Sequence, residues 1–337
     1  MLSGTPVAPG FATVLGHAHE LLFGFALAVA AGFLINRTTT ARLIALFVLW
    51  LLARVLFLGL PGSALAFLAN TGFAVMLAWM TVPQFLRGAK KWRNRAIAPI
   101  LLGLCGMAAL FHISALGDGQ AWLPWLALQQ TVLLLALLML FMGGRIIAPA
   151  VAGAIERSGG RLDARVQPRI EGALLLVVAA AIIASAIPAA APLAAALLGT
   201  SALLALVRLL RWRLWAATGR PDLWCLGLGY GWLVVGLALL AVAWLAPGMH
   251  QGTATHAITV GALGTLTTGV MARVRLNRAH RNPAASRAIP LAAMLVSAAA
   301  LSRLLFPDDI AGLTAASGLW ALAMITVLAL LIRVPAR

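Results

Sequence analysis

Long apolar stretches dominate this chain and leave it few folds to adopt. Runs of roughly 20 apolar residues recur, and each is long enough to cross a hydrocarbon core of about 30 Å as a helix. The chain of 337 residues is 63% hydrophobic and only 10% charged, too few charges to cover a soluble domain of this length. The sequence therefore predicts an all-helical polytopic membrane protein, a single integral membrane domain over residues 1–337.

About eleven such stretches predict a bundle of about eleven transmembrane helices. A secretory signal peptide is not indicated, because the first stretch is too long and no small-residue cleavage site follows it. The predicted spans are Glu20–Ile35, Ala41–Leu60, Ala64–Phe85, Ala96–Leu116, Trp122–Ile147, Ile170–Ile187, Ala190–Leu210, Leu223–Leu245, Thr253–Val274, Ala288–Leu305 and Ile310–Ile332.

The net charge of +17 follows membrane topology and does not indicate nucleic-acid binding. All but two of the 25 lysines and arginines fall on alternate loops between the predicted spans. By the positive-inside rule these loops lie in the cytoplasm. The C-terminus is then cytoplasmic, and an odd number of spans puts the N-terminus outside.

Five of the six histidines lie at the opposite edge of the membrane, which carries almost no lysine or arginine. Imidazole is the commonest metal ligand among side chains, and separate hydrophobic segments bring these five to one level of the bilayer. They are His17, His19, His112, His250 and His256. The pattern predicts a metal or haem site between helices, although His250, in an outer loop, is also explained as a solvated side chain.

The first two of these histidines are two positions apart, so on a helix their rings point about 200° away from each other. Either His17 and His19 lie in a turn before the helix, or they serve different centres. Glu20 shares a face with His17 and could accept the hydrogen bond that fixes a ligating imidazole. A structural reading is also open, in which His19 starts the helix and Glu20 complements the helix dipole.

The two remaining arginines, Arg54 and Arg303, lie inside predicted spans toward their outer ends. A charge at a helix centre costs about 2.5–3.5 kcal/mol on insertion scales, so such residues usually face a partner or a cavity. A haem propionate would bind them through charge-assisted hydrogen bonds. The alternative is that both snorkel to the outer head groups. Glu20 is taken as the only acidic residue within a span, and Asn70 indicates hydrogen bonding between helices.

Motifs spread over nearly the whole chain resemble those of the NnrS family. In order they are residues 17–25 (HAHELLFGF), 31–34 (AGFL), 143–145 (GGR), 228–233 (LGYGWL), 255–262 (THAITVGA) and 271–274 (MARV), together with Arg303. The resemblance implies a haem- and copper-containing protein of the bacterial inner membrane. It also implies a link to nitric oxide, denitrification and protection from nitrosative stress.

Two features depart from the family pattern. Family members usually have twelve spans, with one before the His17 motif, and residues 1–16 are too few for it. The family also tends to carry a histidine after the 271–274 motif, where an ungapped match places Arg278. His280 is two residues out of register, so we expect it to be a loop residue and not a ligand.

The residues and the resemblance together give an expected site. His19 and His256 come from separate helices at matching depth, and we expect them to bind haem b as axial ligands. Arg54 and Arg303 would hold its propionates. The copper ligands would then be His17 and His112, with Glu20 positioning a ligating ring.

We therefore expect a haem–copper type protein acting in the nitric oxide response near the periplasmic face. Its partners would be the lipid bilayer, nitric oxide or a related small ligand, and a quinol or cytochrome as electron donor. Redox or nitric-oxide-metabolising activity is left open, because the residues show no proton pathway. Two other functions remain. Many glycine-rich spans favour a polytopic transporter, although paired broken helices are not evident, and a quinone-linked b-type haem protein would lack copper.

Overall fold

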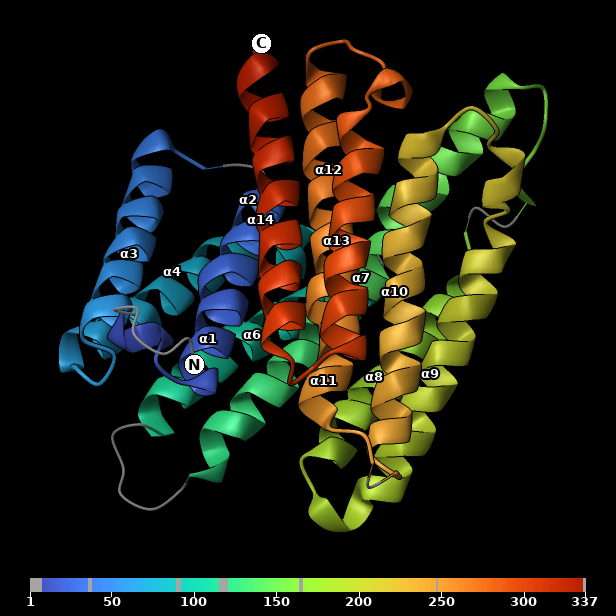
Figure 1. Ribbon diagram of the computed structural model, residues 1–337. Helices are drawn as coiled ribbons and strands as arrows, with labels where there is room; N and C mark the ends of the chain where they lie inside the picture. The colour runs from blue at the N-terminus through green and yellow to red at the C-terminus, as the bar shows by residue number, and fades with distance from the viewer. Residues whose placement is uncertain are drawn as a thin grey trace. The chain divides into compact units, whose positions relative to one another are not determined.

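The computed structural model describes residues 8–35, 38–88, 92–114, 121–163, 166–246 and 248–335, which form helices and no strands (Figure 1). Within these ranges, eleven helices are long and apolar enough to cross a membrane. The all-helical fold and the number of spans are confirmed. Contacts divide the chain into two compact units, Met1–Leu135 and Ala136–Arg337, and each is described by itself. A single domain therefore stays a prediction.

In the first unit, one span is built from three consecutive segments. These are α1 (Val14–His19), the π-helical segment η2 (Glu20–Ala26) and α2 (Leu27–Leu34). The Thr13 hydroxyl caps α1 by accepting a 3.0 Å hydrogen bond from Gly16 N. The helices that follow are α3 (Thr40–Gly59), α4 (Ala64–Gly88), α5 (Trp92–Arg95), α6 (Ile97–Ser114) and the first part of α7 (Trp122–Arg157). Helix α4 packs against both α3 and α6.

The second unit contains the rest of α7 and all later helices. These are α8 (Pro168–Ser185), α9 (Ala191–Arg211), α10 (Pro221–Ala243), α11 (Gln251–His256), the π-helical segment η6 (Ala257–Ala262), α12 (Leu263–Arg278), α13 (Ala288–Leu305) and α14 (Ile310–Arg333). A proline in the first turn begins α8, α9 and α10, where its fixed φ suits a helix start. Helix α10 packs against α9 and α12, and α13 packs against α14.

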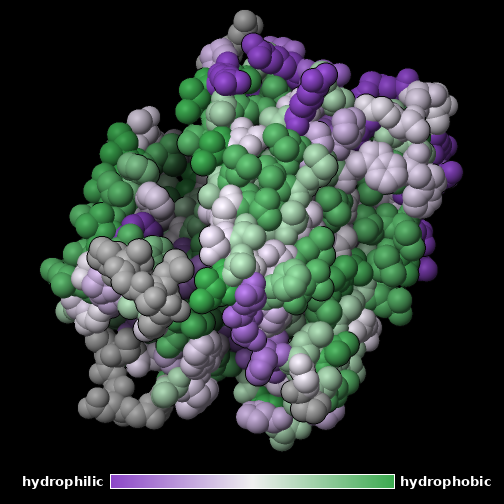
Figure 2. Space-filling model, viewed as in Figure 1, coloured by the Kyte–Doolittle hydropathy of each residue, from purple (hydrophilic) through white to green (hydrophobic). Residues whose placement is uncertain are grey.

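Apolar side chains face outward along several spans, as contact with lipid requires. Helix α3 is among the most apolar spans, yet only 22% of its most apolar stretch is buried, and for α14 the share is 17%. Exposed apolar faces of this size are rare on soluble monomers. Figure 2 shows hydrophobic side chains over the flanks of α13 and α14, and hydrophilic ones gathered where α12 ends and α13 begins.

Several spans extend beyond the bounds that the sequence predicts. The first begins at Val14 and not at Glu20, the fifth continues past Ile147 to Arg157, and the ninth continues to Arg278. Hydropathy ends a predicted span where charged residues or a proline such as Pro149 appear. The helix itself can continue beyond the hydrocarbon core. His17 and His19 therefore lie within a helix, which excludes a turn before it.

Two spans contain a π-helical segment, and each segment begins directly after a candidate histidine. Segment η2 follows His19, and η6 follows His256. Such segments are rare and occur frequently at functional sites, because the wider turn changes which side chains share a face. The hydrophobic periodicity of the sequence predicts neither of them.

Candidate functional site

His19 ends α1, and its ring is fully buried among aromatic side chains of the first unit. The ring stacks on Phe57 of α3, with centroids 3.7 Å apart and planes inclined by 19°. Phe23 of η2 and Phe111 of α6 lie at centroid distances of 5.4 Å and 5.0 Å. These aromatic walls exclude water and hold the imidazole in one orientation.

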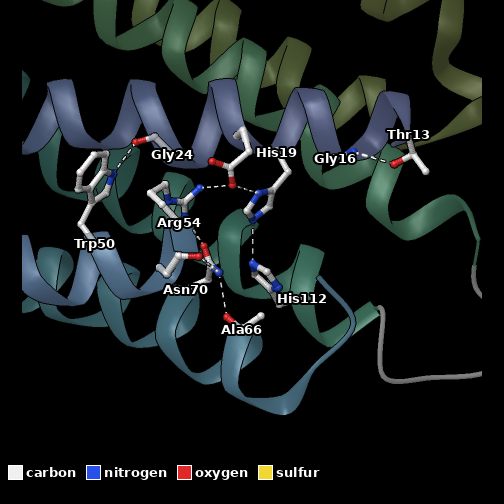
Figure 3. A network of polar contacts seen from close by, with 11 residues as sticks. Thr13, Gly16, His19, Gly24, Trp50, Arg54, Ala66, Asn70 and His112 are labelled. Carbon is white, nitrogen blue, oxygen red and sulfur yellow. Dashed lines mark hydrogen bonds and ion pairs between the residues drawn. The ribbon is translucent and has the colours of Figure 1, made fainter. Parts of the chain in front are cut away.

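The Nε2 atom of His19 faces the Nε2 atom of His112, which lies near the end of α6 (Figure 3). The two nitrogens are 2.9 Å apart, and His112 is also buried. On its other side, His19 Nδ1 lies 3.2 Å from Glu20 Oε1, and a carboxylate only accepts hydrogen bonds. His19 therefore carries its proton on Nδ1, and His112 Nε2 donates to His19 Nε2.

Arg54 of α3 continues this chain of contacts toward α4. Its Nη1 donates a 2.5 Å hydrogen bond to Glu20 Oε1, and its Nη2 donates to Asn70 Oδ1. Asn70 is buried and donates in turn to Ala66 O at 2.8 Å. The guanidinium thus faces inward with a carboxylate beside it, so Arg54 does not snorkel, and Asn70 links helices as the sequence predicts. The buried Glu20–Arg54 pair carries no net charge.

Gly24 makes room for the Arg54 guanidinium. A Cβ at this position would lie 2.5 Å from Arg54 Nη1, closer than any real contact allows. The carbonyl of Gly24 also accepts a 2.9 Å hydrogen bond from Trp50 Nε1. Because Gly24 lies within η2, the π-helical segment and the arginine site depend on the same short stretch of chain.

His17 is exposed and lies on the same helix as His19. At two positions apart on α1, the rings leave the helix on different sides. The contact partner of His112 is thus His19, where the sequence groups His112 with His17 as copper ligands. Which histidines serve haem and which serve copper stays a prediction.

In the second unit, His256 ends α11 and meets Arg303 of α13. Arg303 Nη2 lies 3.4 Å from His256 Nε2, and Arg303 Nη1 donates to Pro307 O at 3.1 Å. His256 Nδ1 lies 3.3 Å from Thr253 O, which places its proton on Nδ1 and leaves Nε2 as an acceptor. Of the expected site, the structure thus brings together His19, His112 and Arg54 in the first unit, and His256 and Arg303 in the second.

Among the described residues, no group of three or more histidine, cysteine or acidic side chains is arranged to hold a metal ion. The potential metal ligands that do contact one another are His19 and His112, and Glu20 contacts His19 on its other side. Two imidazole nitrogens supply half of a four-coordinate site, so further ligands would have to be exogenous or come with a cofactor.

Glu20 is not the only acid within a span, so that expectation is wrong. Glu171 lies in α8 and Asp222 lies in the first turn of α10, and both are buried. Asp222 contacts Arg220 and Arg273, and Glu171 accepts a 3.2 Å hydrogen bond from Arg145. Glu171 already lies within the predicted span Ile170–Ile187, and Asp222 lies one residue before the span Leu223–Leu245. Their partners Arg145 and Arg273 both lie in motifs that the sequence singles out.

Comparison with known proteins gives one match. The profile of the family described as NnrS protein matches residues 1–336, essentially the whole chain. No curated protein and no solved structure matches the chain. The matched range covers both units, including the stretches that carry His19, His112 and His256.

Proposed function

Because the chain belongs to the NnrS family, we propose that it acts in the nitric oxide response as a multi-pass protein of the bacterial inner membrane, with copper held by His19 and His112. The single observation that carries the metal assignment is the buried pair of facing Nε2 atoms. Family membership supports a nitric-oxide-response membrane protein. The bound copper and haem, the location in the bacterial inner membrane and the orientation of the chain in it belong to the proposal.

The pair fits a metal ion on three counts. Neutral imidazole is a good ligand for copper. Two nitrogens 2.9 Å apart have the separation of adjacent ligands on one ion, given metal–nitrogen bonds of about 2.0–2.1 Å and an angle near 90°. Glu20 fixes the proton of His19 on Nδ1, so its Nε2 lone pair would bind copper once the proton of His112 moves from Nε2 to Nδ1. A copper ion held there would supply a one-electron redox couple and an open position for a small ligand.

The contact between His256 and Arg303 would suit a haem group. His256 presents an Nε2 acceptor beside the Arg303 guanidinium, which suits an iron ligand next to a propionate carboxylate. In the first unit, Arg54 Nε is buried and has no hydrogen-bond partner among the described residues, so this donor is open to a carboxylate other than Glu20. Haem iron would supply a binding position for nitric oxide. His19 and His256 as ligands of one haem stay a prediction outside this proposal, because His19 Nε2 is assigned to copper here and the two histidines belong to different units.

The position of these residues along their spans supports a periplasmic site. His19 and His256 lie near the start of their spans, whereas Arg54, His112 and Arg303 lie near the end of theirs. All five therefore fall at the helix ends that lead into loops poor in lysine and arginine. The positive-inside rule assigns those ends to the periplasm.

The test is metal and haem content of the purified full chain after expression with copper and haem supplied. We expect copper bound to the protein, and we expect its loss in His19→Ala and in His112→Ala. His280→Asn is the matched control, because it removes a histidine that is far along the chain from the pair, and it should retain copper. A Soret absorption band should be present, and His256→Ala should abolish or shift it.

The other outcomes separate the alternatives. Haem without copper would indicate a b-type haem protein and remove the role of the histidine pair. Neither group after replete expression would contradict the proposal and favour a transporter. Nitric oxide sensitivity of cells lacking the gene, complemented by each variant, then connects metal retention to function.

A further inference from the structure

A basic pocket lies in the second unit, at the end of the span Gln251–Arg278 opposite to His256. It has a volume of about 580 Å³. Its walls include Arg157 at the end of α7, Arg220 before α10, and Asn277, His280, Arg281 and Asn282 at and after the end of α12. Among the lining residues that the structure describes there is no carboxylate, so the walls offer only hydrogen-bond donors, amides and positive charge.

A buried acid, Asp222, contacts the pocket-lining Arg220, but it does not neutralise the positive charge of the pocket. Asp222 is fully buried and accepts hydrogen bonds from Arg220 Nε and Nη2 at 3.0 Å and 2.9 Å. Asp222 also pairs with Arg273 of α12. Two arginines share one carboxylate, so this group keeps a net positive charge, and Arg157 and Arg281 add to it. The pairing also fixes Arg220 in place.

His280 occupies a backbone position at this pocket that normally favours glycine. Its φ is 55°, in the left-handed region. The hydrogen bonds His280 N to Asn277 O and Arg281 N to Leu276 O close the end of α12 in a Schellman motif. Glycine would avoid the steric conflict of a side chain there. A histidine at this position places an imidazole at the pocket wall, and the turn directs the chain so that Arg281 lines it too.

We propose that this pocket binds a phosphate-bearing anion, and the surroundings favour the head group of an anionic phospholipid. Arginine guanidinium groups match phosphate oxygens in a bidentate manner, and the amides of Asn277 and Asn282 are further polar groups on the walls. The spans of α7, α10 and α12 end or begin at this pocket, which is the level of lipid phosphates. Trp224, one helical turn from Arg220, is about half exposed, as interfacial tryptophans are.

The experiment titrates phosphatidylglycerol into the purified full chain in an uncharged detergent and follows the thermal unfolding midpoint. Phosphatidylcholine is the lipid control. We expect phosphatidylglycerol to raise the midpoint and phosphatidylcholine to leave it. Arg157→Gln with Arg281→Gln should weaken the apparent affinity about tenfold or more, since each removes a charge-assisted contact. The matched control is Arg211→Gln with Arg287→Gln, two exposed arginines of the same unit that do not line the pocket.

His280→Gly separates binding from folding. It relieves the left-handed backbone strain, so the midpoint without lipid should not fall, while affinity for phosphatidylglycerol should drop. If millimolar inorganic phosphate competes with phosphatidylglycerol, the ligand is a soluble phosphate compound. If inorganic phosphate does not compete, the ligand is the lipid. If phosphatidylglycerol and phosphate both have no effect, or if the pocket variant binds as tightly as the control variant, the proposal is overturned.

Discussion

Glu20 is the residue on which the two halves of the first-unit site depend. Its Oε1 accepts from His19 Nδ1 at 3.2 Å and from Arg54 Nη1 at 2.5 Å. The first contact sets the tautomer of a candidate ligand, and the second balances a buried cation. A buried ion pair contributes little net stability compared with apolar residues, but removing one partner leaves an unpaired charge. The carboxylate is therefore placed for the chemistry of His19 more than for stability.

Glu20→Gln tests this placement. The amide keeps the shape but leaves Arg54 as an uncompensated buried cation, so we expect a loss of about 3–5 kcal/mol in unfolding free energy. Adding Arg54→Met should restore much of that loss, because the charge is then absent. The measurement is the unfolding midpoint of both variants in detergent. Losses that simply add in the double variant would show that the two residues do not act as a pair.

Gly24→Ala tests the space beside Arg54. The added Cβ would lie 2.5 Å from Arg54 Nη1, so the guanidinium must move and its contacts with Glu20 and Asn70 must lengthen. We expect a cost of about 1–3 kcal/mol, as for overpacked cores. Gly32→Ala in the same span is the control, because nothing lies within 4 Å of its Cβ. Equal unfolding midpoints for the two alanine variants would contradict the argument.

At the scale of elements, the packing of helices against one another decides which residues meet. The sequence predicts the spans and the depth of the histidines, because span length and charge placement depend only on composition along the chain. It does not predict that His19 meets His112, since that contact depends on how helices far apart in the sequence pack together. Nor does it predict Arg220–Asp222–Arg273, which joins the start of α10 to α12.

At the scale of the whole molecule, charge placement predicts the orientation of the chain. Ser158 follows α7 at the arginine-rich end, and Gln251 begins α11 at the histidine end. Both cysteines of the chain are buried, which keeps background labelling low. The loop at residues 117–120, which the same rule also places outside, lies outside the described residues.

An impermeant maleimide should therefore label Gln251→Cys in intact cells and Ser158→Cys only after the membrane is opened. The reason is the positive-inside rule, which puts the arginine-rich loops in the cytoplasm. Labelling of Ser158→Cys in intact cells would invert the topology and move the histidine sites to the cytoplasmic face.

Helix α3 has only four buried residues, Leu46, Ala53, Arg54 and Phe57, and two of these side chains touch the site through Glu20 and His19. In lipid, helices gain little from apolar contact with one another, because the acyl chains are as apolar as leucine. The place of α3 in its unit therefore depends largely on the polar contacts of Arg54 with Glu20 and Asn70, so a substitution that breaks them would loosen the helix and the histidine site together.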